Sequence, residues 1–409
     1  MSALAPWTPR RHTLSPMAED LAPALKEDRT PIRATIAGTR LELIESGRAR
    51  LEALLELIRG AEHSFRLLFY IFVGDASGTA VRDALVDAAK RGVRVHVLLD
   101  GYGCSKIGPG FFKVLRDNGG KFCLFNPVYG RRYLVRNHQK LAIADDRRAL
   151  IGGANIEDCY LTDEGPQHWR DLWLAIDGPI VAGAAGYFDA VYRWTGLEGA
   201  KLKSLRRLVA RYSDREGPLQ WHFSAPLSLR TPWPAVFGRD LYHATRVDVI
   251  HAYFSPPRSM LRRLGRVAAR GRVRVITAGK SDIEATIGAA RHSYMRMLRR
   301  GVEMYEYEPA MLHTKLAIID DAVHIGSPNF DFRSLYINLE ISLRIENSKF
   351  AAAMRGYFEQ ERADSVRITP ELHRKRATPW RRLKWMVAHW LVTSMDYAVT
   401  RRLNLPLER

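Results

Sequence analysis

The stretch Asn137-His138-Gln139-Lys140-Leu141-Ala142-Ile143-Ala144-Asp145 decides the fold, because the chain contains the same pattern a second time. The second copy reads Leu312-His313-Thr314-Lys315-Leu316-Ala317-Ile318-Ile319-Asp320. In both copies one residue separates His from Lys, and four residues separate Lys from Asp. A turn of small residues follows each copy and ends in an asparagine, Asn155 after the first and Asn329 after the second. The sequence therefore predicts a site that is built from two repeats.

The segments around the two motifs repeat one order of strands and helices. In the first half, residues 64–73 and 93–99 form apolar runs of strand length, with a helical pattern at 78–91 between them. Residues 247–254, 258–270 and 273–277 repeat this order in the second half. The offset between the copies is 313 − 138 = 175 at the histidines and 326 − 152 = 174 at the turn glycines. We therefore predict an α/β protein with two similar halves, each made of βαβ units around a largely parallel sheet.

The chain of 409 residues is long for one domain, so we divide it into five regions. We expect an irregular proline-containing leader at 1–38, a first half at 39–195, a basic insert at 196–240, a second half at 241–362 and a basic tail at 363–409. The leader has no apolar core of the kind that a secretory signal needs. No run of about 18 uncharged apolar residues occurs, so we expect no membrane span.

The charge of the chain is its most unusual bulk property. Lys and Arg number 63 against 44 Asp and Glu, which gives a net charge of +19. Such an excess favours a polyanionic partner, either nucleic acid or the surface of an anionic membrane. The three cysteines, Cys104, Cys123 and Cys159, have no metal-type spacing, and we expect inert thiols.

The residue types of the motif suit a phosphodiester. On a strand, His and Lys two positions apart project from the same face. If the halves pack with pseudo-two-fold symmetry, one site receives two imidazoles and two ammonium groups, and Asn155 and Asn329 add amide donors. One neutral imidazole can attack phosphorus while the other donates and later accepts a proton. We expect no metal or other cofactor, because each His stands beside a Lys that would repel a cation. Histidines that serve only the core would not explain two matching copies.

Both copies match the H-x-K-x4-D motif of the phospholipase D superfamily, and the resemblance covers about residues 39–347. Within that superfamily, the segments 70–72, 169–179 and 331–340 resemble bacterial cardiolipin synthases. The total length and the expected lack of membrane spans resemble the shorter, peripherally bound branch of these enzymes. The resemblance implies transfer of a phosphatidyl group between two phosphatidylglycerol molecules, giving cardiolipin and glycerol through a phosphohistidine. It also implies a peripheral location on the cytoplasmic face of the bacterial inner membrane.

The resemblance also implies roles for individual residues. His138 is expected to be the nucleophile and His313 the general acid and base. Lys140 and Lys315, together with Asn155 and Asn329, are expected to bind the phosphate.

A carboxylate on a later strand is implied to orient each histidine. Asp171 lies 33 residues after His138, and Glu340 lies 27 residues after His313. The motif aspartates, Asp145 and Asp320, end their strands, where a role in the turn and a role in phosphate binding both stay open. The first turn reads Gly-Gly-Ala-Asn and the second Gly-Ser-Pro-Asn, so the hydroxyl of Ser327 has no counterpart in the first turn.

Two segments outside the repeats bear on the partner. Residues 201–211 and 381–397 both combine apolar residues at helical spacing with Arg and Lys. Each fits either a helix that lies in the interface of an anionic membrane or a helix that docks on the protein core. Three functional alternatives follow: a nuclease, a hydrolase of another phosphodiester, and a non-catalytic protein that binds anionic membranes. We expect no nucleic acid partner, because a nuclease has little use for an apolar tail with two tryptophans.

Overall fold

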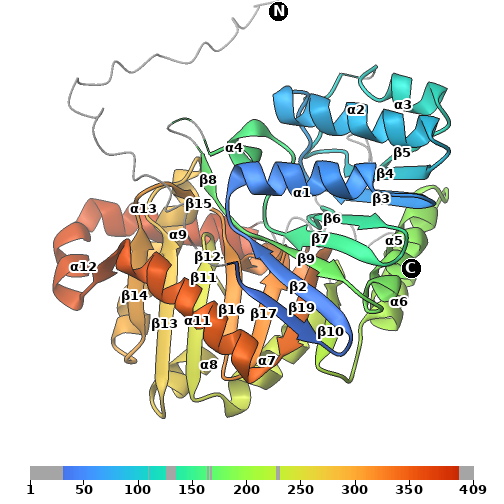
Figure 1. Ribbon diagram of the computed structural model, residues 1–409. Coiled ribbons are helices and arrows are strands. Elements are labelled where there is room, and N and C mark those ends of the chain that lie inside the picture. The colour runs from blue at the N-terminus through green and yellow to red at the C-terminus, as the bar shows by residue number, and fades with distance from the viewer. Residues whose placement is uncertain are drawn as a thin grey trace, which may run out of the picture. The chain divides into compact units, whose positions relative to one another are not determined.

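The structure is a computed structural model that describes residues 31–108, 110–125, 135–163, 165, 168–226 and 231–395. These residues form two α/β halves with one eight-stranded sheet each (Figure 1). From β9 to β5 the first sheet has the same strand order as the second sheet from β19 to β14. The α/β class and the repeat are therefore confirmed.

The first sheet lies between helices of the N-terminal half. In spatial order its strands are β1 (Arg33–Ile36), β2 (Thr39–Ile44), β9 (Trp173–Asp177), β7 (Arg148–Gly152), β6 (Leu141–Ala144), β3 (Ser64–Phe69), β4 (Arg94–Asp100) and β5 (Lys121–Phe125). Its helices are α1 (Gly47–Arg59), α2 (Ala76–Lys90), α3 (Lys113–Asp117), α4 (Asp158–Leu161), α5 (Val181–Thr195) and α6 (Leu202–Tyr212).

The second sheet repeats this arrangement. Its strands are β10 (Leu219–Ser224), β19 (Glu340–Glu346), β17 (Ala322–Gly326), β16 (Lys315–Ile319), β11 (Arg246–His251), β13 (Arg272–Ala278), β14 (Glu303–Tyr307) and β20 (Ser365–Ile368). Its helices are α7 (Pro232–His243), α8 (Arg258–Ala268), α9 (Glu284–Leu298), α10 (Phe332–Tyr336), α11 (Ser348–Ala363), α12 (Pro370–Arg376) and α13 (Pro379–Trp390), which continues as the π-helical turn η1 (Leu391–Met395). Two short pairs complete the fold, β8 (Trp169–Arg170) with β15 (Met311–Leu312) and β12 (Phe254–Ser255) with β18 (Phe330–Asp331).

The sheets are mixed, and the expectation of a largely parallel sheet is wrong. In the first sheet only β3–β4 and β4–β5 are parallel, while β6 is antiparallel to both β3 and β7. Three residues connect β6 to β7. A connection that short can only make a hairpin, because a parallel return needs a crossover of a dozen or more residues. Each motif strand therefore lies at the centre of its sheet with an antiparallel neighbour on either side.

The alternation of side chains along the motif strands explains how the sheets pack. Leu141 and Ile143 point into an apolar core that also contains Leu316 and Ile318 of the second half. Ala142 of β6 and Ala317 of β16 point away from this shared core, each into a core that belongs to its own half. Because successive strand residues face opposite sides, each motif strand is buried on both faces. The core shared by the two halves brings the motif strands close together.

Several segments differ from the regions expected from sequence. The strand β1 lies within the expected irregular leader and pairs antiparallel with β2. The strand β10 lies within the expected insert, yet it forms the edge of the second sheet beside β19. The strand β20 begins the expected tail and pairs with β14. These three strands are four to six residues long. Their short sequences carried too little periodicity to mark them as strands.

The two basic amphipathic segments have different surroundings. In α6 the residues Leu202, Leu205 and Val209 are buried, and the helix packs on α5. The 201–211 segment is therefore a docked helix. In α13 two residues are buried against α9, and most of its other apolar side chains are exposed. Over the part of the chain that the structure describes, no helix combines the length and apolarity required to cross a bilayer. The sequence also has a basic segment before the first motif, with Arg131 and Arg132. These two residues, and residues 396 and 397 of the tail, lie outside the described residues.

Candidate active site

The two motif histidines are held by backbone contacts that cross between the halves. His138 precedes β6, and its backbone N–H donates to the carbonyl of Leu339 at 2.9 Å. His313 precedes β16, and its backbone N–H donates to the carbonyl of Arg170 at 2.8 Å. The strand β8 of the first half also pairs with β15 of the second half, directly before His313. Each motif is therefore positioned partly by the other half of the chain.

The carboxylates are also exchanged between the halves. Nδ1 of His138 lies 3.0 Å from Glu340 Oε2, and Nδ1 of His313 lies 2.6 Å from Asp171 Oδ2. In the sequence, Asp171 follows His138 and Glu340 follows His313, so each carboxylate was expected to contact the histidine of its own half. In the structure each contacts the histidine of the other half. Both carboxylates are completely buried. A carboxylate at Nδ1 holds the proton on that nitrogen and leaves Nε2 as the basic nitrogen.

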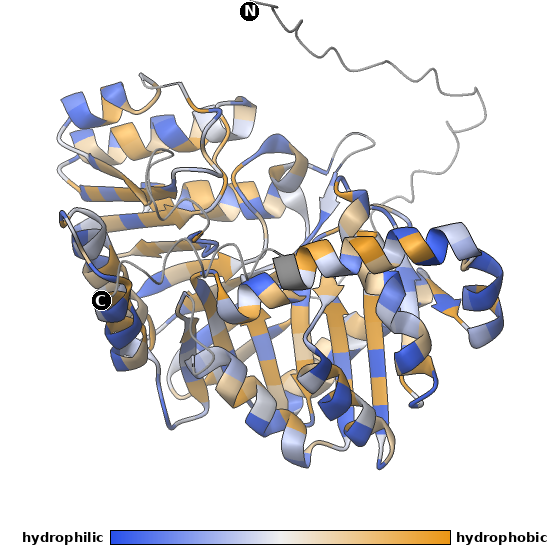
Figure 2. Ribbon diagram, turned by 180° about the vertical axis from the view of Figure 1, so that it is seen from behind, coloured by the Kyte–Doolittle hydropathy of each residue, from blue (hydrophilic) through white to orange (hydrophobic). Residues whose placement is uncertain are grey.

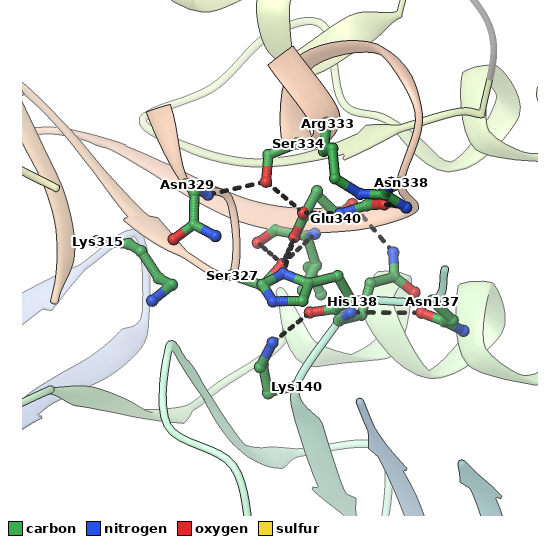
Figure 3. A network of polar contacts seen from close by, with 12 residues as sticks. Asn137, His138, Lys140, Lys315, Ser327, Asn329, Arg333, Ser334, Asn338 and Glu340 are labelled. Atoms are coloured by element: carbon green, nitrogen blue, oxygen red, sulfur yellow. Dashed lines mark hydrogen bonds and ion pairs between the residues drawn. The ribbon is translucent and has the colours of Figure 1, made fainter. Parts of the chain in front are cut away.

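The two carboxylates are held differently. Glu340 accepts hydrogen bonds from Ser327 Oγ at 2.5 Å, from Ser334 Oγ at 2.7 Å and from Asn338 Nδ2 at 3.3 Å (Figure 3). Asp171 instead accepts from the backbone N–H of Leu172 at 2.8 Å. Opposite Asp171 the first turn has Gly153 where the second has Ser327, and a Cβ there would lie 2.6 Å from both Asp171 oxygens. Glycine is needed because the carboxylate fills the space that a side chain would take.

Two buried lysines supply the positive charge of the site. Lys140 and Lys315 are both at most 2% exposed, and each ammonium donates to the backbone carbonyl of the histidine in its own motif. Figure 3 shows the two ammonium groups on different sides of the His138 imidazole. Burial lowers the pKa of Lys315 to about 8 and the pKa of Lys140 well below its ordinary value, and each lysine is partly compensated by Glu340 and Asp171. An anionic ligand would strengthen the preference of both lysines for the charged form.

The imidazoles are neutral in the free protein. Burial, together with the neighbouring lysines, lowers the pKa of His138 to about 4 and that of His313 to about 3, although the carboxylate beside each imidazole acts in the opposite direction. Burial would raise the pKa of Glu340 and Asp171, but the lysines and histidines lower it, so both stay ionised. A neutral imidazole with an ionised carboxylate behind it has the protonation state of a nucleophile.

Asn155 and Asn329 follow the motif strands, and both are buried. Asn155 Oδ1 accepts from the backbone N–H of Ile71 at 3.2 Å, so its amide group faces a loop of the first half. Among the described residues, no hydrogen-bond donor reaches Asn329 Oδ1. Figure 3 shows the Asn329 side chain between Lys315 and the Glu340 cluster. Oδ1 of Asn329 can therefore accept from a ligand donor such as a hydroxyl, and only its Nδ2 can donate to a phosphate oxygen, whereas Asn155 has a closer tie to the fold.

Asp145 and Asp320 lie outside this cluster, at the other ends of β6 and β16. Asp145 accepts from the backbone N–H groups of Glu62, His63 and Ser64 at 2.8–2.9 Å. Asp320 accepts in the same way from Thr245 and Arg246. Both have a positive φ, 53° and 46°, which suits a tight turn that an aspartate side chain supports. The structure thus favours the turn role for both residues over phosphate binding.

The site also contains aromatic residues that the repeat did not identify. The ring of Tyr70 lies 4.8 Å from that of His138, and the rings of Tyr160 and Trp169 lie 5.0 and 5.3 Å from that of His313. They exclude water from the imidazoles and so contribute to the low pKa values. Tyr70 and Trp169 lie in segments that resemble cardiolipin synthases, and this resemblance could have identified them as site residues. Tyr160 has no equivalent in the repeat, and its neighbourhood depends on the packing of α4.

In the described ranges, no group of three or more His, Cys, Asp and Glu side chains is arranged to hold a metal ion. The expectation that the reaction needs no metal continues to rest on the charge of the motifs. Cys104, Cys123 and Cys159 are free thiols, and burial raises the pKa of each above its ordinary value. Raised pKa values make thiolate chemistry at these positions unfavourable.

Comparison with known proteins gives consistent results. Residues 54–183 and 241–362 match the sequence family described as "Cardiolipin synthase, PLD-like domain". Cardiolipin synthase B of Salmonella typhimurium is 30% identical over 367 residues, which cover 87% of this chain and 88% of that protein. Cardiolipin synthase A of Pseudomonas putida is 31% identical over 352 residues, which cover 83% of this chain and 72% of that protein.

Two solved structures share the fold. The phosphatidylserine synthase of Haemophilus influenzae superposes with a TM-score of 0.70 at 14% identity, covering 90% of this chain and 96% of that one. The polyphosphate kinase of Porphyromonas gingivalis superposes with a TM-score of 0.57 at 14% identity, covering 90% of this chain and 53% of that one. At this level of identity the two structures establish the fold alone.

Proposed function

The chain belongs to the cardiolipin synthase family of PLD-like proteins, and from this premise we propose that it is a phosphatidyltransferase that makes cardiolipin. The proposed substrates are two molecules of phosphatidylglycerol, and the proposed products are cardiolipin and glycerol. The observation that carries the proposal is the pair of buried histidines, each hydrogen-bonded through Nδ1 to a carboxylate of the other half.

In the first step Nε2 of His138 attacks the phosphorus of one phosphatidylglycerol. A P–N bond forms, the bond from phosphorus to the glycerol oxygen breaks, and His313 gives its proton to the departing glycerol. The low pKa of His313 in the free protein suits this role only if the substrate raises it. An anionic phosphodiester beside the imidazolium has that effect, because opposite charges favour the charged form.

In the second step a hydroxyl of another phosphatidylglycerol attacks the same phosphorus. His313, now neutral, takes the hydroxyl proton, a new P–O bond forms and the P–N bond to His138 breaks. Lys140, Lys315 and Asn329 balance the charge on the phosphate oxygens in both steps. Glu340 stabilises the positive charge that develops on His138, and Asp171 does the same for His313.

We further propose that the protein acts peripherally on the cytoplasmic face of the bacterial inner membrane. The net charge of +19 and the family's anionic lipid chemistry support this location. Nucleic acid is not proposed as a substrate.

The experiment is to incubate purified protein with phosphatidylglycerol vesicles and to identify the products by mass spectrometry. Cardiolipin and glycerol in equal amounts are expected, and a His138→Ala variant serves as the inactive control. Phosphatidic acid without cardiolipin would show that water is the acceptor and that the protein is a hydrolase. Cleavage of a DNA or RNA substrate without lipid turnover would identify a nuclease instead.

A further inference from the structure

The helix α13 is docked on the protein by one face only. Trp385 and Ala388 are buried against α9, where Gly288 has its Cα opposite both residues, and a Cβ there would lie 3.3 Å from each. Six other large apolar residues are 38–66% exposed, five in α13 and one at the start of η1: Trp380, Leu383, Met386, Val387, Trp390 and Leu391. We call these six the outer apolar ridge. In Figure 2 much of α13 is orange, although the helix lies at the surface of the second half.

The positions of these residues around the helix are those of an interfacial helix. With about 100° between successive residues, the outer apolar ridge occupies an arc of about 140° opposite the docked face. Lys384 stands at one border of that arc and Arg382 at the other, and both are exposed. No Asp or Glu occurs between Ala377 and Met395. An apolar strip with cations along both borders matches the boundary between acyl chains and anionic headgroups.

Four residues of the outer apolar ridge also line a groove, which adds to the apolar surface. It has a volume of about 340 Å³ and lies between α9 and α13, lined by Ala285, Trp380, Leu383, Lys384, Val387, Ala388 and Leu391. The lining is apolar, and Lys384, the one charged residue in it, contributes the aliphatic part of its side chain.

Both elements of this surface connect directly to the candidate active site. The turn η1 packs on α10, and α10 carries Ser334, which donates to Glu340. Asp282, two residues before α9 begins, accepts from the hydroxyl of Tyr253, whose ring lies 6.0 Å from that of His313. A surface held by α9 and η1 is therefore held close to the two imidazoles.

We propose that the outer apolar ridge inserts into the interface of an anionic lipid bilayer and holds the active site at the membrane surface. This inference rests on the proposed function for the substrate, but the membrane contact is a separate property. A second copy of the chain is the competing occupant of the ridge. The bordering cations favour the bilayer, because two copies that met through this face would bring like charges together.

The experiment compares Trp380→Ser/Met386→Ser/Trp390→Ser with wild type. The three side chains are at least half exposed, so their loss leaves the buried contacts of α13 intact. Leu197→Ser and Tyr242→Ser are the controls, because both residues are 63% exposed and lie away from α13. Binding is measured by co-sedimentation with phosphatidylglycerol vesicles and with neutral phosphatidylcholine vesicles. The triple variant is expected to bind the anionic vesicles at least tenfold more weakly, and the controls are expected to bind like wild type.

Two further measurements keep the outcomes separate. Activity of the triple variant on dispersed short-chain phosphatidylglycerol is expected to match wild type, because the site itself is unchanged. Unaltered binding to anionic vesicles by the triple variant would overturn the proposal. The proposal would also be overturned if wild type were a dimer in analytical ultracentrifugation and the triple variant were a monomer that still bound vesicles. A second copy of the chain would then be what covers the ridge. Wild type that binds vesicles but makes no cardiolipin would refute the proposed function and leave the membrane contact standing.

Discussion

Replacing Glu340 with Gln tests whether the carboxylates work across the halves. The substitution keeps the size of the side chain and an oxygen that can accept from His138 Nδ1, but it removes the negative charge. In the structure that charge lies 3.0 Å from Nδ1 of His138 and is held by Ser327 and Ser334. A hydrogen bond to a charged group contributes about 1.5–3 kcal/mol, so attack by His138 is expected to slow by about 10- to 150-fold.

The assay uses a phosphatidyl ester of p-nitrophenol, whose anion leaves without being protonated. Formation of the phosphohistidine then needs the nucleophile but no general acid, and it appears as a burst of nitrophenolate. Glu340→Gln is expected to slow the burst. Asp171→Asn is expected to leave the burst near wild type and to slow the later transfer to an alcohol, because Asp171 contacts His313. Glu346→Gln, at the exposed end of the same strand, is the control and is expected to do neither.

The opposite pattern would refute this reasoning. A slow burst in Asp171→Asn with a normal burst in Glu340→Gln would mean that Asp171 supports the nucleophile. Either the pairing across the halves or the choice of His138 as nucleophile would then be wrong. Trapping the labelled histidine by mass spectrometry distinguishes the two, because it identifies the nucleophile independently.

The remaining predictions concern metals, the second turn, the motif aspartates and pH. His138→Ala is expected to abolish cardiolipin formation while a chelator leaves wild-type turnover unchanged; loss of turnover with EDTA would argue for a metal. Ser327→Ala, which removes a 2.5 Å contact to Glu340, is expected to lower kcat by about 3- to 10-fold in steady-state kinetics. Asp145→Ala is expected to lower the free energy of unfolding by about 1–3 kcal/mol in urea titrations, since three backbone N–H groups lose their acceptor. Lost turnover at unchanged stability would instead give Asp145 a direct role. Because burial lowers the pKa of His138 to about 4 and of His313 to about 3, the folded protein binds fewer protons than the unfolded chain below about pH 6.5. Its stability is therefore expected to be highest above that pH and to fall by a few kcal/mol toward pH 4, and a flat stability profile would contradict the buried neutral imidazoles.

Much of the site could be predicted because its residues repeat. The equal spacing of His, Lys and Asp in both copies was enough to predict a shared site. The strand period could not place His138 and Lys140, because both precede β6. The partner of each carboxylate could not be predicted in this way, because Asp171 follows His138 and Glu340 follows His313 at similar distances, which suggested a pairing within each half. That pairing depends on β8 and β15 meeting between the halves, and each of these strands is only two residues long.

The fold was predictable to a similar depth. Apolar runs identified the central strands, since these are buried on both faces and need no further signal. Whether neighbouring strands are parallel or antiparallel could have been predicted from the length of the connections, since the three residues between β6 and β7 allow only an antiparallel hairpin. The edge strands β1, β10 and β20 join their sheets through backbone hydrogen bonds to distant segments, which local sequence does not encode.

The unequal support of the two carboxylates has a consequence for how such a site evolves. A symmetric homodimer would surround both imidazoles with identical residues, and any improvement to one would be forced on the other. Joining the two copies in one polypeptide removes that restriction, so three side chains gather around Glu340 while Asp171 keeps a glycine and a backbone amide beside it. Within one chain, the surroundings of His138 and His313 can therefore differ, as the contacts of Glu340 and Asp171 do.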